Sequence, residues 1–92
     1  MEIKVEHNPD QETLQKLGVF DWSIWRKEIS DFPWTYDDQE TCYFLEGDVI
    51  VTPDQGNPVQ IGKGDLVTFP VGLSCRWNII KPVKKHYYFG VL

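Results

Sequence analysis

Short runs of apolar and β-branched residues, separated by turns that contain glycine or proline, make up most of the chain after Gly18. Residues 54–58 and 62–65 have the composition of turns, and the glycine in segment 46–48 lies between two β-rich runs. This last pattern predicts a tight hairpin. Because short strands at this spacing are typical of a sandwich or a small barrel, we predict an all-β fold.

One helix signal stands near the N-terminus. Asn8 is a suitable helix cap, Pro9 suits the first helical position, and Gln11 can close a capping box. Gly18 is placed to end the helix. Residues 1–6 alternate between apolar and charged side chains, which predicts a half-buried strand. The all-β fold is therefore expected to carry one short N-terminal helix.

The chain has 92 residues, a length that typically forms one domain around one core. We predict a single domain over residues 1–92. Its uncharged apolar stretches are much shorter than a membrane span, and residues 1–10 lack the apolar segment of a signal peptide. We expect no membrane partner and a cytoplasmic protein, in which Cys42 and Cys75 remain thiols.

The charge of the chain narrows the class of partner. The net charge is −5 at pH 7, which argues against nucleic acid because phosphates are repelled by an acidic protein. Basic residues gather toward the C-terminal end, where Lys81, Lys84 and Lys85 lie close in sequence. Since lysine side chains are rarely buried, this cluster is expected to be a solvated face.

Two segments keep a spacing that is more specific than that of a general β-sheet. In the first, six residues separate Glu40 from Gly47. The second contains three fixed positions, Gly64, Pro70 and Gly72. Together they resemble the two motifs of the cupin family, which are small β-barrels of the jelly-roll type. Residues 40–53 and 64–77 further resemble small stand-alone cupins grouped with the (S)-ureidoglycine aminohydrolase type domain. The resemblance implies a single-domain jelly-roll barrel and a small nitrogenous or carboxylate ligand.

The positions that bind metal in metal-containing cupins are altered here. The resemblance places three histidines at positions that hold Trp34, Tyr36 and Cys75, and only the glutamate, Glu40, is kept. Indole cannot bind a metal because its nitrogen is only a donor. We therefore predict no metal and no other cofactor. A non-standard site made by Tyr36, Glu40 and Cys75 remains an alternative, because a thiolate would favour zinc, copper or iron.

The barrel interior has two interpretations. Strand alternation places Glu40, Cys42 and Phe44 on one face. Four aromatic residues are expected beside Glu40 as ligand-binding walls: Trp34, Phe44, Phe69 and Trp77. They would either fill the core or line a pocket for a small molecule. In a pocket, Glu40 would be the acid or base and Tyr36 a hydrogen-bond donor. In a filled core, Glu40→Gln should leave stability equal or raised.

Cys75, the third candidate catalytic residue, also has two interpretations: a small buried apolar side chain or a nucleophilic thiol. Three functions stay open for the chain as a whole. It is a cupin that binds a compact metabolite and acts on it, a ligand-binding or sensory module without catalysis, or a structural barrel that self-associates. Met1, Ile3 and Val5 form an apolar face on the N-terminal strand, so we expect a homodimer built with that strand.

Overall fold

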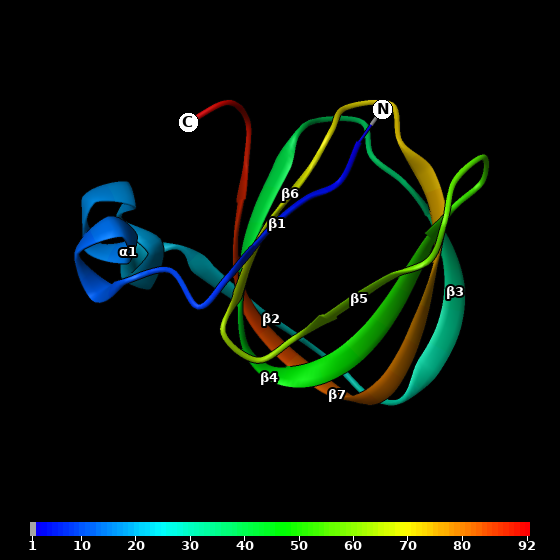
Figure 1. The fold of residues 1–92 in the computed structure, drawn as a ribbon, viewed down its shortest axis with the longest axis horizontal. Helices are drawn as coiled ribbons and strands as arrows, with labels where there is room; N and C mark the ends of the chain where they lie inside the picture. The colour runs from blue at the N-terminus through cyan, green and yellow to red at the C-terminus, as the bar shows by residue number, and fades with distance from the viewer. Residues whose placement is uncertain (1) are drawn as a thin grey trace.

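Seven antiparallel strands form one sheet that curls into a barrel in the computed structural model, which describes residues 2–92 (Figure 1). The elements in chain order are β1 (Lys4–His7), α1 (Gln11–Leu17), the 3₁₀ turn η1 (Val19–Asp21), β2 (Ser23–Lys27), β3 (Ser30–Thr35), β4 (Glu40–Pro53), β5 (Val59–Gly62), β6 (Asp65–Phe69) and β7 (Ser74–Phe89). Neighbouring strands follow the order β1-β6-β4-β7-β2, while β3 also pairs with β7 and β5 with β4. The all-β barrel with one short helix is confirmed.

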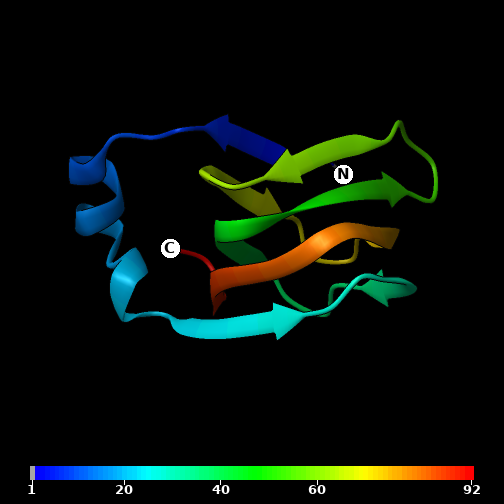
Figure 2. The ribbon, with the colours of Figure 1, turned by 90° about the horizontal axis from the view of Figure 1, so that it is seen from below.

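The two longest strands, β4 and β7, pair with each other along most of their length. The hairpin predicted at residues 46–48 is wrong, because β4 continues through this segment. Its pairing with β7 shifts register there, as at a β-bulge. Residues 76–80 and 86–89 likewise lie on one continuous strand, β7. Both strands bend around the barrel (Figures 1 and 2).

Gly47 explains why a turn-like sequence lies inside β4. Its φ angle is +119°, and a Cβ atom there would lie 2.9 Å from the Pro82 carbonyl oxygen and 2.9 Å from the Val83 Cα. Only glycine fits such a close approach of two backbones. The glycine therefore permits the bulge in β4, and does not close a hairpin.

The helix α1 begins two residues later than the sequence suggests. Asp10 is its N-cap, and the Asp10 carboxylate accepts a hydrogen bond of 2.8 Å from the Thr13 amide. The predicted cap, Asn8, instead has a positive φ, and its backbone N–H donates to the Gly64 carbonyl. Gly18 ends the helix in the left-handed conformation, as expected.

Buried apolar side chains form two clusters. The main one fills the barrel and includes Phe44, Phe69 and Trp77. The second, made by Leu14, Val19 and Leu66, joins α1 and η1 to the barrel wall. The helix consequently lies beside the barrel, outside its interior (Figure 1).

The N-terminal strand is used within the chain. β1 pairs with β6, and Ile3 and Val5 pack against the main core. Met1 lies outside the described residues. Part of the apolar face on which the dimer prediction rests is therefore covered within the monomer. Dimerisation through this strand stays a prediction.

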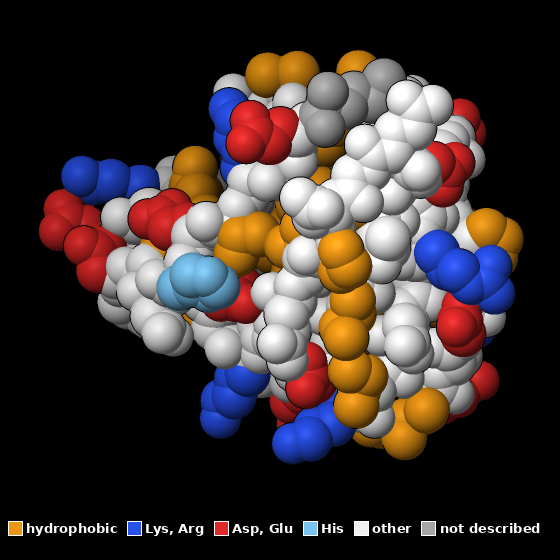
Figure 3. All heavy atoms as spheres, turned by 45° about the vertical axis from the view of Figure 1, so that its right-hand side comes forward, with side chains coloured by type: hydrophobic (Ala, Val, Ile, Leu, Met, Phe, Trp, Pro, Cys, Tyr) orange, Lys and Arg blue, Asp and Glu red, His pale blue; other side chains and the backbone are white. Residues whose placement is uncertain are grey.

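One face of the described surface carries mixed charge. Acidic and basic side chains are interspersed on the face in Figure 3. Lys81, Lys84 and Lys85 are predicted to form a solvated basic face. This prediction is wrong for Lys85, which is only 4% exposed, whereas Lys81 is exposed. Among residues 2–92, no helix has the length and apolar character needed to cross a membrane.

Candidate functional site

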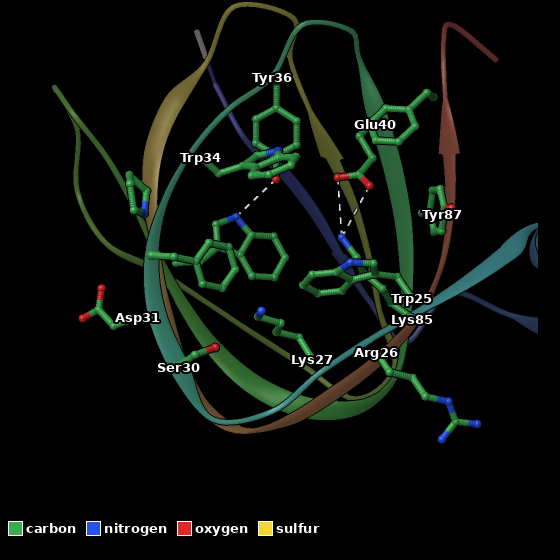
Figure 4. A pocket seen from close by; sticks show the side chains of 14 residues that line it. Trp25, Arg26, Lys27, Ser30, Asp31, Trp34, Tyr36, Glu40, Lys85 and Tyr87 are labelled. Atoms are coloured by element: carbon green, nitrogen blue, oxygen red, sulfur yellow. Dashed lines mark hydrogen bonds and ion pairs between the residues drawn. The ribbon is translucent and has the colours of Figure 1, made fainter.

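A cavity of about 800 Å³ opens into the barrel between β2, β3 and the inner faces of β4 and β7 (Figure 4). Its size is in the range of small-molecule sites, roughly 300–1,000 Å³. The aromatic part of its lining consists of Trp25, Phe32, Trp34, Tyr36, Trp77, Tyr87 and Phe89. The charged residues that line it include Lys27, Glu40 and Lys85. The barrel interior is therefore partly an open pocket, as well as a packed core.

A buried ion pair forms one wall of the cavity. The Lys85 Nζ atom lies 3.5 Å from each carboxylate oxygen of Glu40. The two side chains are only 5% and 6% exposed. Each charge thus has its counter-charge beside it, which buried ionised groups require.

Aromatic rings surround the Lys85 ammonium. In the sheet, Lys85 lies opposite Trp25 of β2 on one side and Phe44 of β4 on the other. Its Nζ is 4.8 Å from the Trp25 ring centroid and 4.7 Å from that of Trp77. Rings at these distances attract a cation through their negative faces. The site therefore holds Lys85 by cation–π contacts in addition to the Glu40 charge.

Cys42 is the third partner of Lys85. The ammonium donates to the Cys42 Sγ at 3.2 Å. Burial raises the pKa of the Cys42 thiol to about 12, although the Lys85 charge acts in the opposite direction. Cys42 is therefore a neutral thiol at pH 7, and the charge of Lys85 is balanced by Glu40.

Tyr36, the candidate hydrogen-bond donor, lines the cavity. Its hydroxyl accepts a hydrogen bond of 3.2 Å from the Trp77 Nε1, and its ring stacks on Phe69 with centroids 4.8 Å apart. No hydrogen bond joins Tyr36 to Glu40 within residues 2–92. Burial raises the pKa of Tyr36 far above its usual range, and the Glu40 charge adds to this. Tyr36 thus stays a neutral phenol.

The other sequence-predicted residues divide into two groups. Trp34 and Trp77 line the cavity, and Trp34 is 48% exposed at its edge. Phe44 and Phe69 are fully buried in the core and are absent from the cavity lining.

Cys75, the third candidate catalytic residue, is also buried and does not line the cavity. Its thiol donates to the Trp34 carbonyl at 3.5 Å. Burial, with a smaller effect of the Asp54 charge, raises the pKa of Cys75 to about 11. Such a thiol is poorly suited to nucleophilic attack at neutral pH.

The residues at the metal-ligand positions of the cupin motif do not fit a metal ion. Among the described residues, no three His, Cys, Asp or Glu side chains are grouped as a metal site. Glu40, the one ligand that the motif keeps, already faces the Lys85 ammonium. A divalent cation at this carboxylate would be repelled by that charge. The neutral phenol of Tyr36 and the neutral thiol of Cys75 are poor ligands as well.

Sequence reasoning missed Lys85, Lys27 and Trp25 as cavity residues. A signal for Lys85 was available, because Trp77, Ile79 and Val83 share its strand parity and all three are buried. Strand alternation from these three residues points Lys85 to the inner face, but Lys81 has the same parity and is exposed, so alternation alone does not decide its side. The usual exposure of lysine favoured the opposite interpretation.

Comparison with known proteins agrees with the barrel fold. The family described as the EutQ-like cupin domain matches residues 14–87. A DUF861 family protein from Thermotoga maritima is 55% identical with a TM-score of 0.92, covering 96% of this chain and 99% of its own. No functionally curated protein matches the chain.

More distant solved structures share the fold. The EutQ protein from Clostridium difficile is 21% identical with a TM-score of 0.66, over 73% of this chain and 52% of its own. The present chain thus spans about half the length of that protein. A DUF1255 protein of unknown function from Acidithiobacillus ferrooxidans is 16% identical with a TM-score of 0.66, over 68% of this chain and 60% of its own. With its matched residues, its barrel and its 55% identical relative, the chain belongs to the EutQ-like cupin domain family.

Proposed function

We propose that this cupin binds a compact organic molecule in the barrel cavity and that Glu40 and Lys85 form its reactive centre. The observation that carries the proposal is the position of a buried ion pair on the wall of an open cavity. Taking two charges out of water costs several kcal/mol per ion, so a buried pair is a weak source of stability. A role toward a bound molecule accounts for its presence there.

The pair has the groups needed for acid–base chemistry. Glu40 can accept a proton from a bound molecule, and the Lys85 ammonium can stabilise the negative charge that remains. The contacts of 3.5 Å between them are longer than the 2.7–2.9 Å typical of charge-assisted hydrogen bonds. Both groups can therefore form shorter bonds to a ligand atom. The aromatic walls lower the polarity around the pair, which strengthens such bonds.

A second candidate is a ligand-binding or sensory module without catalysis. It is favoured by the full set of partners around Lys85, since Glu40, Cys42 and the rings of Trp25 and Trp77 hold the ammonium in place. A fixed charge suits recognition as well as catalysis. Turnover of a bound compound supports the first function, and saturable binding without turnover supports the second.

A thermal-shift screen of compact metabolites tests both. The narrower resemblance to the (S)-ureidoglycine aminohydrolase type domain makes small nitrogenous and carboxylate compounds the first set to try. A ligand at 100 times its Kd should stabilise the protein by about 2.7 kcal/mol. We expect this gain in the parent protein and its loss in Glu40→Gln and Lys85→Met.

Glu46→Gln is the matched control, because Glu46 lies on the same strand but is exposed. It should keep the full ligand response. Ligands that stabilise the Glu40 and Lys85 variants as much as the parent would contradict the proposal. The expected compartment is the cytoplasm, where both cysteines, which are free in the structure, stay reduced.

A further inference from the structure

We infer that the ligand of this cavity is a compact planar carboxylate and that Lys27 binds its carboxylate group. This inference rests on the proposed function and names the chemical class of its ligand. It is carried by the charges that face the cavity, by the partners they already have, and by the shape of the aromatic walls.

The side chains that point into the cavity leave a positive charge. Figure 4 shows the Lys27 and Lys85 nitrogens directed into the barrel interior, with Glu40 as the carboxylate beside them. Asp31 and Arg26 also line the cavity, but their charged groups point away from its interior in the same view. Asp31 is moreover paired with Arg76. The interior thus carries two ammonium groups and one carboxylate, in a chain whose net charge is −5.

Lys85 already occupies the place that a cationic ligand would need. Its ammonium lies beside Glu40 and near the faces of Trp25 and Trp77. Carboxylates and aromatic faces are the groups that recognise organic cations. A cation from solution would have to displace a side chain that is tethered to β7. The site therefore disfavours ammonium ligands.

Lys27 is the ammonium left without a counter-charge. Among residues 2–92, no carboxylate lies within ion-pair distance of its Nζ, which sits 5.7 Å from the Phe32 ring centroid. The side chain is half-buried, so part of its hydration is already removed. A ligand carboxylate beside Lys27 would complete the charge balance of the cavity and accept a charge-assisted hydrogen bond.

Flat ring faces set the shape of the ligand body. Phe32 stacks on Trp77 with centroids 6.0 Å apart and an angle of 17° between the rings, and Trp25 meets Trp77 edge-on at 76°. A planar ring packs against such faces more closely than a puckered one, and aromatic pairs gain energy beyond area burial. The volume of about 800 Å³ admits one ring with its carboxylate.

Four probes of nearly equal size separate charge from shape. Benzoate, benzamide, benzylamine and cyclohexanecarboxylate are titrated into the full chain by calorimetry at low and at high salt. We expect benzoate to bind at least about tenfold more tightly than benzamide, as a charged hydrogen bond implies. Benzylamine should bind more weakly than either, and cyclohexanecarboxylate more weakly than benzoate. The advantage of benzoate should shrink at high salt.

Lys27→Met keeps the side-chain stem and removes its charge. It should lower the benzoate affinity to that of benzamide and leave benzamide unchanged, while Lys27→Arg restores the preference. Lys63→Met, at an exposed turn position, is the control and should bind like the parent. The inference is overturned if benzamide binds as tightly as benzoate, if Lys27→Met keeps the preference, or if none of the probes binds. Equal binding of benzoate and benzamide that still depends on Glu40 and Lys85 would overturn the ligand class while leaving the proposed function intact.

Discussion

The Lys85 ammonium lies 3.5 Å from both carboxylate oxygens of Glu40, and this contact links β7 to β4 inside the barrel. Both side chains are nearly excluded from solvent, yet both border an open cavity. We therefore expect the pair to contribute to stability and, under the proposed function, to ligand binding as well.

Breaking the pair from either side should destabilise the protein. From the sequence alone, Glu40→Gln is expected to leave stability equal or raised, but the structure adds a buried Lys85 that this variant leaves without a counter-charge. We now expect Glu40→Gln and Lys85→Met each to lower the free energy of unfolding by about 3 kcal/mol. Urea denaturation of both variants measures this.

The double variant distinguishes a true pair from two independent sites. Removing both charges leaves no uncompensated ion. The decrease in the free energy of unfolding of the Glu40→Gln, Lys85→Met double variant should therefore be smaller, by about 1–3 kcal/mol, than the sum of the decreases in the two single variants. Additive losses would show that the two charges do not interact, and would contradict the pairing described above.

The cysteines should be unreactive at neutral pH. Burial raises the pKa of Cys75 from 9.0 to about 11, so the thiolate fraction at pH 8 should be about a hundredfold lower than in the unfolded chain. Iodoacetamide labelling of native and urea-unfolded protein, followed by mass spectrometry, measures the ratio. Native Cys75 labelled at pH 8 as fast as in the unfolded chain would contradict the assignment.

The same shifts give a pH dependence of stability. Folded Cys42 and Cys75 have raised pKa values, so the unfolded chain loses its thiol protons first as the pH rises. The contribution of these raised pKa values to the free energy of unfolding is complete below about pH 9. It falls as the pH rises toward 11. Cys75→Ser should reduce this alkaline loss in denaturation curves measured between pH 8 and 11.

Gly47→Ala should be severely destabilising. The methyl group would meet the backbone of Pro82 and Val83 at 2.9 Å, and φ is +119°. We expect a loss of roughly 3 kcal/mol or more. Gly18→Ala is the control, because Gly18 also has a positive φ but no atom within 4 Å of the added Cβ, so about 1 kcal/mol is expected. Equal losses would mean that the close approach at Gly47 has no cost.

The barrel could be predicted from the sequence, but the path of its longest strands could not. A glycine between two β-rich runs has the same local composition in a hairpin and in a bulge. What distinguishes Gly47 is its contact with Val83, a residue far away in the sequence. Across the bulge, the buried positions of β4 change from Cys42 and Phe44 to Val49 and Val51, a shift of parity that local composition hides.

Only one half of the Glu40–Lys85 pair could be predicted from the sequence, again because the other half depends on contacts between distant residues. The motif and strand alternation placed Glu40 on the inner face, and the structure agrees. They could not supply its partner, because a lysine is buried only when tertiary contacts balance its charge. Those contacts come from Trp25 on β2 and Glu40 on β4, and neither is near Lys85 in sequence.

Dimerisation is still expected, through the free edge of β1. Among the described strands, β1 pairs only with β6, which leaves its second edge open to a copy of the chain. Sedimentation equilibrium at micromolar concentrations should give twice the monomer mass of 10.8 kDa. A single species at the monomer mass would contradict the expectation.

The central claim is that a small molecule binds inside the barrel beside Glu40 and Lys85, and the tryptophans report on it directly. Trp25, Trp34 and Trp77 line the cavity, whereas Trp22 packs against Tyr88 away from it. In ¹⁵N NMR spectra, each indole N–H gives its own signal. On titration with benzoate, or with any compound from the screen, the signals of the three cavity tryptophans should shift in a saturable way while that of Trp22 stays in place. Binding that shifts Trp22 alone, or that leaves the three cavity signals unmoved, would contradict the claim.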